Sequence, residues 1–265
     1  MISILIPNRD SFEAIQLCIE SIRRFTQCPY KIIVWDDCSV NGIDLKYLRE
    51  CRDKGWLTLH EGTKHLSHGG VLNKLLNEIC DTELAVVMDS DVQVFRHGWL
   101  EDMAQAVSSG EDIIAVSGIM KKYHTPHCYR TPIYNCWFGI IDMRLYKDGM
   151  QTDWTNKHVD RRDEPYKTIF APYYPPTEAG IDWNRFNENQ VAIDPGGKFW
   201  VKVNYDNPKG YRVLPLPPIL YSKHRHFCHV TFIAFPQFDN NPKVVAERKA
   251  KFAQIKAELQ RLRGK

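Results

Sequence analysis

The chain of 265 residues lacks any apolar run long enough to cross a membrane, which would need ~18 consecutive residues. Its longest apolar runs are short, such as Leu84–Met88. The eight cysteines form no CxxC pair and no regular framework, which favours buried free thiols over disulfides. The first residues show no basic region followed by a small-residue cleavage site, so we expect no signal peptide. These absences predict a cytoplasmic protein, with peripheral contact at a membrane as an alternative.

Two common nucleotide-binding motifs are also missing. Without GxGxxG a nicotinamide site is disfavoured, and without GxxxxGK[ST] a P-loop is excluded. The net charge is only +3, and residues 243–265 hold eight Lys or Arg against two Glu. The rest of the chain has 27 basic and 30 acidic residues, so we expect no nucleic-acid partner. The content of 43% apolar and 25% charged residues is typical of a globular protein.

The first half of the chain alternates apolar runs with helical patterns. Asp10 is a candidate N-cap, with Glu13 three residues later, and opens a helix with apolar residues every three or four positions. The alternation predicts parallel strands joined by helical crossovers, hence an α/β fold with an open, mostly parallel sheet. We expect strands over 2–7, 31–35, 57–59, 84–88 and 113–116, and further helices over 45–51, 71–79 and 99–107.

The second half is rich in Tyr, Trp, Pro and His from residue 121 to 218. A strand is expected within 134–142 and a helix over 178–189, whereas 196–205 fits either. Residues 243–263 form a basic helix with one apolar face, made by Val245, Phe252, Ile255, Leu259 and Leu262. This helix could dock on its own domain, form a homodimer seam or lie on a membrane surface.

The most informative segment is Asp89-Ser90-Asp91, which follows an apolar strand. Two carboxylates so close together repel each other, and a divalent cation removes that cost. Hard oxygen ligands suit Mg2+ or Mn2+, ions that commonly bind substrate phosphates. The alternative is a solvated acidic turn.

Other predicted strands also end in polar residues. Pro7-Asn8-Arg9-Asp10 follows the first strand, and Asp36-Asp37 follows the second. The carboxyl ends of parallel strands meet at one edge of a sheet, where ligands bind. The segment from His68 to Asn73 adds two glycines at a helix start, where backbone N–H groups suit an anion.

Taken together, these segments resemble family 2 glycosyltransferases of the GT-A fold over about residues 1–120. The order and spacing match together, which is more specific than any single piece. The matching segments are Ser3–Arg9, Ile33–Ser39, Gly69–Asn73 and Val87–Val92.

The resemblance implies transfer of a sugar, with inversion, from a nucleotide-diphospho-sugar that is usually a UDP-sugar. It implies Mn2+ or Mg2+ held by Asp89 and Asp91. Residues 1–120 would be the nucleotide-sugar-binding half, 121–240 the acceptor-binding half of the same domain, and 241–265 the basic C-terminal helix. The residues that would contact the donor are Pro7, Asn8, Arg9, Asp36, Asp37, Gly69, Gly70, Asn73, Asp89 and Ser90.

The family's catalytic carboxylate follows the Asp-x-Asp, often as Glu-Asp before a helix, and this chain lacks a clean match. Asp194, in Val191–Gly197, follows an apolar run and precedes a turn, so we expect it to be the general base. Asp182 and Glu188 are the reserves. An Asp-Pro turn without chemistry is the alternative.

A histidine-rich segment lies near the end of the domain. It overlays the family's His-x-Gly-Gly-x-Ser/Thr pattern, with Cys228 and His229 in place of the glycines. His226 is then the expected third metal ligand or diphosphate contact, with His229 as the alternative. Structural zinc is disfavoured because HxHxxH is not a standard zinc spacing.

The acceptor is a glycan, a lipid-linked sugar or a protein, and the aromatic residues of the middle region are candidates to stack on it. Two other functions stay open. A nucleotidyltransferase would also use carboxylates and Mg2+, but the loop after the first strand lacks the usual glycine. A non-catalytic carbohydrate-binding relative would bind sugar without turnover.

Overall fold

The structure is a computed structural model. It describes residues 1–118, 123–125, 128–130, 136–155, 157–160, 163–164, 167–168, 190–193, 195–227 and 242–264.

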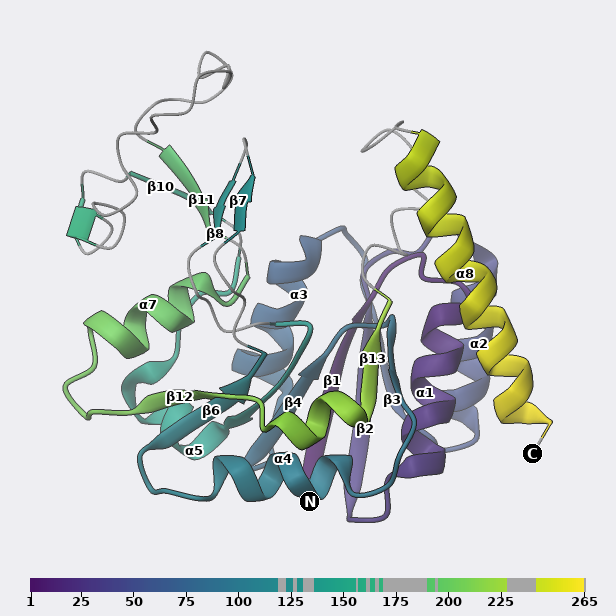
Figure 1. Cartoon of the computed structure of the whole chain (residues 1–265), viewed down its shortest axis with the longest axis horizontal. Helices are drawn as coiled ribbons and strands as arrows, with labels where there is room; N and C mark the ends of the chain where they lie inside the picture. Colours follow the sequence, from purple (N-terminus) through teal and green to yellow (C-terminus); the bar gives the residue numbers. More distant parts are fainter. Residues whose placement is uncertain are drawn as a thin grey trace.

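A seven-stranded sheet forms the centre of the molecule, in the order β12-β6-β9-β4-β1-β2-β3 (Figure 1). Adjacent strands pair in parallel except at β9, which runs antiparallel to both β4 and β6. The strands are β1 (Ile2–Asn8), β2 (Tyr30–Asp36), β3 (Thr58–Glu61), β4 (Leu84–Met88), β6 (Ile113–Ser117), β9 (Phe138–Asp142) and β12 (Arg212–Pro215). The expected α/β fold with an open, mostly parallel sheet is therefore confirmed.

Helices cover both faces of this sheet, so the domain has three layers. Alternate residues of β1 point to opposite faces, as Ile4 and Leu5 do, and both are fully buried. The Ile4 face packs against α1 (Glu13–Phe25), α2 (Gly42–Asp53) and α4 (Trp99–Val107). The Leu5 face packs against α3 (Ser67–Lys74), the π-helix η1 (Leu75–Ile79), the short α5 (Met143–Leu145) with η2 (Tyr146–Met150), and α7 (Gly197–Tyr205).

Small two-stranded sheets complete the described architecture. The pair that matters for the site is β5 (Val92–Val94) with β13 (His224–His226). The others are β7 (Tyr123–Thr125) with β8 (Cys128–Arg130) and β10 (Lys157–Asp160) with β11 (Gln190–Ile193). A short 3-10 helix, η5 (Pro218–Ser222), leads into β13.

One predicted helix cap is wrong. The side chain of Asp10 does not cap α1, whose N-cap residue is Phe12 and which has no side-chain cap bond. Asp10 instead accepts hydrogen bonds from the backbone N–H groups of Val40 and Asn41, at 2.9 and 3.0 Å. Asp10 and Phe12 both have positive φ angles, so the chain turns sharply here before α1 begins. The long-range partners of Asp10 therefore replace the local cap.

The other expected elements differ mainly at their ends. The helix expected over 71–79 begins at Ser67 and changes to π geometry at Leu75. The segment 196–205, which fitted either structure, is helical as α7. The helix expected over 178–189 lies outside the described residues. Six cysteines are free thiols, as expected.

The C-terminal helix α8 (Pro242–Arg263) docks on its own domain. Ile255 and Leu259 pack against Ala14 and Leu17 of α1 and against Phe227. Ion pairs reinforce the contact, including Lys256–Glu13 at 3.2 Å and Arg263–Glu20 at 2.6 Å. In the described part of the chain, every helix is too short or too polar to serve as a membrane span.

Candidate active site

Three side chains converge beyond the carboxyl end of β4. A tight turn follows the strand, in which Val92 N–H donates to the Asp89 carbonyl at 3.2 Å. The chain then enters β5, which pairs with β13 so that His226 lies opposite Val92. Phe227 N–H donates to the Asp91 carbonyl at 3.1 Å, which fixes the end of β13 beside the turn. The pairing of two short strands therefore brings His226 to the two carboxylates.

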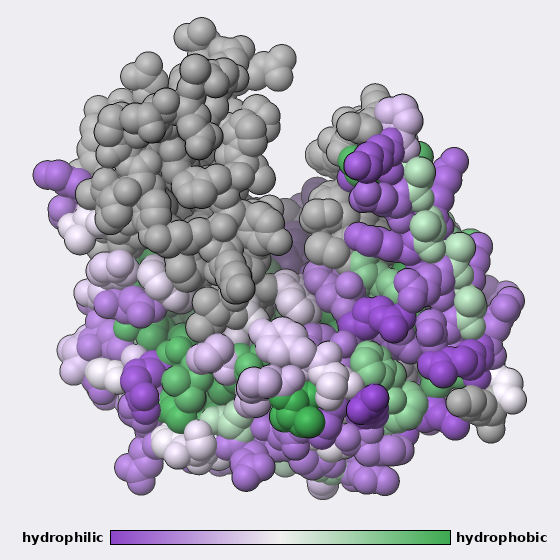
Figure 2. All heavy atoms as spheres, viewed as in Figure 1, coloured by the Kyte–Doolittle hydropathy of each residue, from purple (hydrophilic) through white to green (hydrophobic). Residues whose placement is uncertain are grey.

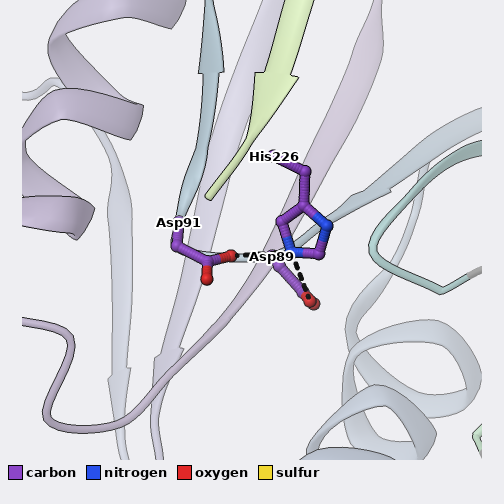
Figure 3. Close-up of side chains that lie close together, drawn as sticks. All are labelled: Asp89, Asp91 and His226. Carbon is purple, nitrogen blue, oxygen red and sulfur yellow. Dashed lines mark ion pairs between the residues drawn. The ribbon is translucent and has the colours of Figure 1, made fainter. Parts of the chain in front are cut away.

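Figure 3 shows Asp89, Asp91 and His226 pointing toward one another. Nε2 of His226 lies 3.1 Å from Asp91 Oδ1 and 3.7 Å from Asp89 Oδ2. The Asp91 side chain is only 5% exposed, whereas that of Asp89 is 26% exposed. A solvated acidic turn would leave both carboxylates in water, so this alternative does not describe Asp91. The indole of Trp137 stacks on His226 with ring centroids 4.5 Å apart and holds its orientation.

The electrostatics of the cluster follow from the mutual pairing of its groups. Burial alone lowers the pKa of His226, but the hydrogen bond to Asp91 and the two carboxylate charges raise it above its ordinary value. Burial alone raises the pKa of Asp89, but the imidazoles of His68 and His226 lower it below its ordinary value. Burial, followed by the charges of Asp91 and Asp89, raises the pKa of the neighbouring Cys18 thiol.

The cluster fits a divalent cation. One ligand atom from each of Asp89, Asp91 and His226 lies within 4.8 Å of the others. Two carboxylates and an imidazole suit Mn2+, and two hard oxygens also suit Mg2+. The imidazoles of His68 and His226 compensate the carboxylate charges; a bound cation would take over this compensation, with His226 as a neutral ligand.

His68 is a site residue that the sequence reasoning missed. It lies at the start of α3, and its Nε2 is 3.0 Å from Asp89 Oδ1, on the other carboxylate oxygen from His226. Burial lowers the pKa of His68, but Asp89 and Cys136 raise it well above its ordinary value. In the sequence, the position of His68 directly before the glycine pair was the one feature that could have pointed to it. Its contact with Asp89 depends on the fold, which brings α3 beside β4.

Asp36 and Asn8 bind each other at the ends of β2 and β1. Asn8 Nδ2 donates to Asp36 Oδ1 at 2.8 Å, and both residues are buried. Asp36 also accepts from the Ser39 backbone N–H at 2.9 Å and from its hydroxyl at 2.6 Å. These bonds fix the loop after β2, so the predicted nucleoside residues form a rigid, connected edge of the sheet.

Asp37 holds the start of α3. Its carboxylate accepts from the backbone N–H groups of Leu66 and Ser67, at 2.7 and 3.1 Å, and lies 2.6 Å from His65 Nδ1. From the two glycines at this helix start, we expected its N–H groups to suit an anion. The Asp37 carboxylate already binds part of this helix start, which agrees with the preference of helix N-termini for negative charge.

The remaining predicted donor residues differ in their burial and contacts. Gly69 is buried inside α3, and a Cβ added to Gly70 would lie 3.0 Å from Cβ of Leu66. Asn73 Oδ1 accepts from Asn77 Nδ2 at 2.8 Å and from Trp154 N–H at 3.3 Å. Asn73 therefore ties α3 to the loop after η2. Of the rest, Pro7 and Ser90 are buried and Arg9 is partly exposed beside Asp10.

Two predicted residues cannot be placed. Asp194, the expected base, and His229, the alternative metal ligand, lie outside the described residues, as do the reserves Asp182 and Glu188. The residues just before Asp194 form β11, which pairs with β10, and Pro195 after it is buried.

A buried acid beneath the donor edge gives a first prediction. Asp44 is fully buried and accepts from Ser11 N–H at 2.7 Å. Burial raises the pKa of Asp44 from 3.8 to about 6, against the lowering effect of its hydrogen bonds. The folded state thus binds this proton more tightly than the unfolded chain, so the unfolding free energy falls as pH rises through this range.

Asn in place of Asp44 removes this titration but keeps an acceptor oxygen. We expect the unfolding free energy of the wild type, relative to Asp44→Asn, to drop by about 2–3 kcal/mol between pH 4 and pH 7. Urea unfolding of both proteins at several pH values measures the difference. A pH-independent difference would show that Asp44 titrates normally.

Comparison with known proteins agrees with the sequence resemblance. The model of the family described as "Glycosyl transferase family 2" matches residues 3–164. No curated protein matches the chain. Among solved structures, TarS residues 1–349 from S. aureus is 20% identical, with a TM-score of 0.42, over 56% of this chain and 48% of that chain. The chain thus spans about half the length of that protein.

A second solved structure aligns along most of the chain. The mannosyltransferase PcManGT from Pyrobaculum calidifontis, in complex with GDP-Man and Mn2+, is 16% identical, with a TM-score of 0.47. The alignment covers 97% of this chain and 75% of that chain. The family model carries the assignment, because it spans well over half of the sequence, including the Asp89–Asp91 segment. The chain therefore belongs to glycosyl transferase family 2.

Proposed function

We propose that this protein transfers a sugar from a nucleotide-diphospho-sugar, in the first instance a UDP-sugar, to an acceptor hydroxyl with inversion at the anomeric carbon. The cluster of Asp89, Asp91 and His226 at the carboxyl edge of the sheet is the observation that supports it. Ligands of open α/β sheets bind at this edge. The acceptor class is a glycan, a lipid-linked sugar or a protein.

In this proposal the cluster holds Mn2+ or Mg2+ against the donor diphosphate. The cation supplies Lewis-acid stabilisation of the charge that develops as the nucleoside diphosphate leaves. Asp91, buried and oriented by His226, supplies a fixed ligand, and Asp89 supplies a second from the more exposed side. Trp137 restrains His226, so the ligands need little reorganisation when the cation binds.

The nucleoside is proposed to bind over the edge formed by Asn8, Asp36 and Asp37. Their side chains are held by the loops after β1 and β2 and by the start of α3. Rigid polar groups at this edge position the donor with little loss of conformational freedom on binding. For proton transfer we propose Asp194 as the base that takes the acceptor hydroxyl proton, on the sequence resemblance alone.

A donor screen tests the proposal. With Mn2+ present, the correct nucleotide-sugar at ~100 times its Kd is expected to raise the melting temperature by about 5 °C, because it binds the folded state alone. UDP-sugars and GDP-sugars are each tested, with release of the nucleoside diphosphate as the activity readout. EDTA is expected to abolish both effects, and re-addition of Mn2+ to restore them.

Three outcomes would contradict the proposal. The first is that no nucleotide-sugar shifts the melting temperature or is cleaved. The second is release of pyrophosphate from a nucleoside triphosphate, which would indicate a nucleotidyltransferase. The third is binding of a nucleotide-sugar without transfer to any acceptor or to water, which would indicate a non-catalytic relative.

A further inference from the structure

The packing of α8 on α1 places one end of α8 beyond the edge of the sheet. Lys256 pairs with Glu13, the first residue of α1, and Arg263 pairs with Glu20 further along it. The two helices therefore run in the same direction. Residues of α8 before about 252 extend past the start of α1, by roughly 15 Å at 1.5 Å per residue. Figure 1 shows this end of α8 projecting beyond α1.

The projecting end of α8 lies on the side of the sheet where the site is. Helix α1 follows β1, so its first residue lies at the carboxyl edge, as do Asp89 and Asp91. Phe252 makes an edge-to-face contact with Phe12, in the loop between β1 and α1, with ring centroids 6.0 Å apart. The first ten residues of α8 therefore stand beside the proposed donor site.

The inward face of α8 changes from apolar to cationic along its length. Arg248, Phe252, Ile255 and Leu259 have the spacing of one helix face. Ile255 and Leu259 are buried against α1, whereas Arg248, one turn before Phe252, is 8% exposed although it is charged. Lys251 is partly buried on the same side, and its neighbour Lys249 is exposed. In Figure 2 the outward side of α8 is mostly hydrophilic.

Strand β13 links α8 to the metal-binding cluster. Phe227, which directly follows His226, packs against Ile255 and Leu259. Arg225, on the other side of His226, pairs with Glu258 of α8 at 3.8 Å. The ammonium of Lys251 lies within electrostatic range of the His226 imidazole, so Lys251 stands near the cluster.

We propose that Lys251 and Arg248 of α8 bind the diphosphate of the nucleotide-sugar donor, next to the cluster of Asp89, Asp91 and His226 that would hold the cation. This inference rests on the proposed function. The diphosphate of a nucleotide-sugar carries two negative charges. The carboxylates of Asp89 and Asp91 would already balance the charge of a divalent cation, so fixed side-chain cations would bind phosphate oxygens with charge-assisted hydrogen bonds. The planar guanidinium of Arg248 suits two phosphate oxygens, and the ammonium of Lys251 acts as a point charge.

The inward direction of these two cations favours a bound ligand over a lipid surface. A membrane-binding helix needs its apolar face free to enter the lipid. Here Phe252, Ile255 and Leu259 face α1 and the site strand. Of the basic residues of this helix, Arg248 and Lys251 are thereby assigned to the donor.

The test compares binding of a nucleoside with that of its diphosphate. Lys251→Gln removes one charge at the proposed subsite. Arg248→Lys keeps the charge but removes the planar guanidinium that could bind two phosphate oxygens. The control, Lys249→Gln, removes a charge from the exposed side of the same helix. Binding of UDP, and in parallel GDP, is measured by calorimetry with Mn2+ present. The corresponding nucleosides are measured as controls, and melting temperatures without ligand report folding.

Lys251→Gln is expected to weaken diphosphate binding about tenfold, and Arg248→Lys about fivefold, because each loses a charge-assisted contact. Nucleoside binding and the Lys249→Gln variant are expected to match the wild type. Equal diphosphate affinities for Lys251→Gln and Lys249→Gln, in folded proteins, would overturn the inference. A wild type that binds neither diphosphate would instead overturn the proposed function.

Discussion

Replacing Asp91 with Asn is expected to lower the rate of sugar transfer by at least about 1,000-fold. Asp91 is almost completely buried and points at the same space as Asp89 and His226, and within the described residues the cluster holds no carboxylate besides Asp89 and Asp91. The amide has nearly the same shape, and it removes one of two neighbouring negative charges. The variant is therefore expected to fold, and its melting temperature without metal checks this.

The decisive measurement is the response of the melting temperature to Mn2+ and the nucleoside diphosphate. Mn2+ together with the nucleoside diphosphate is expected to raise the melting temperature of the wild type but not that of Asp91→Asn. Asp112→Asn is the matched control, because Asp112 forms an exposed ion pair with Arg212 outside the metal cluster, and exposed pairs contribute little. Transfer by Asp91→Asn within tenfold of the wild type would contradict a metal site here.

Ile255→Ala is expected to lower the free energy of unfolding by about 2–5 kcal/mol. Ile255 is fully buried between α8, α1 and Phe227, and the truncation leaves a cavity in that cluster. The effect is this large because α8 docks on its own domain. An outward-facing apolar stripe, used only for a dimer or a membrane, would lose little unfolding free energy in the monomer.

Urea unfolding measures this loss, and Gln254→Ala serves as its control. Gln254 is the exposed neighbour of Ile255 on the same helix, and its truncation is expected to change the unfolding free energy by less than about 0.5 kcal/mol. A similarly small effect for Ile255→Ala would mean that α8 separates from α1 in solution. That result would also remove the physical basis for placing Arg248 and Lys251 at the donor site.

Local sequence patterns predicted the framework of the sheet because they depend on short-range periodicity. The apolar runs of β1, β2 and β4 are buried on both faces, and parallel strands covered by helices produce such runs. The residues that follow these runs, Asn8, Asp36 and Asp89, then meet at one edge of the sheet. The family pattern predicted that a distant histidine joins Asp89 and Asp91, and His226 does form an ion pair with Asp91.

Long-range contacts explain what the sequence did not reveal. The antiparallel insertion of β9 between β4 and β6 joins segments from both halves of the chain. The local sequence predicted Asp10 as a helix cap, but its carboxylate binds the backbone N–H groups of Val40 and Asn41 in the loop after β2 instead. The only signal for His68 was its position before the glycine pair, and its contact with Asp89 exists only because the fold brings the start of α3 to the end of β4.

By itself, the sequence determined an α/β domain with an acidic pair at the end of a central strand and a basic amphipathic helix at its end. The tertiary structure decided which histidines lie at that pair, that Asp37 holds the start of α3, and that α8 packs on α1. The physical reason is the distance along the chain between the residues that decide each feature. Periodicity and strand ends depend on neighbouring residues, whereas ligand geometry and helix docking depend on side chains brought together from distant parts of the chain.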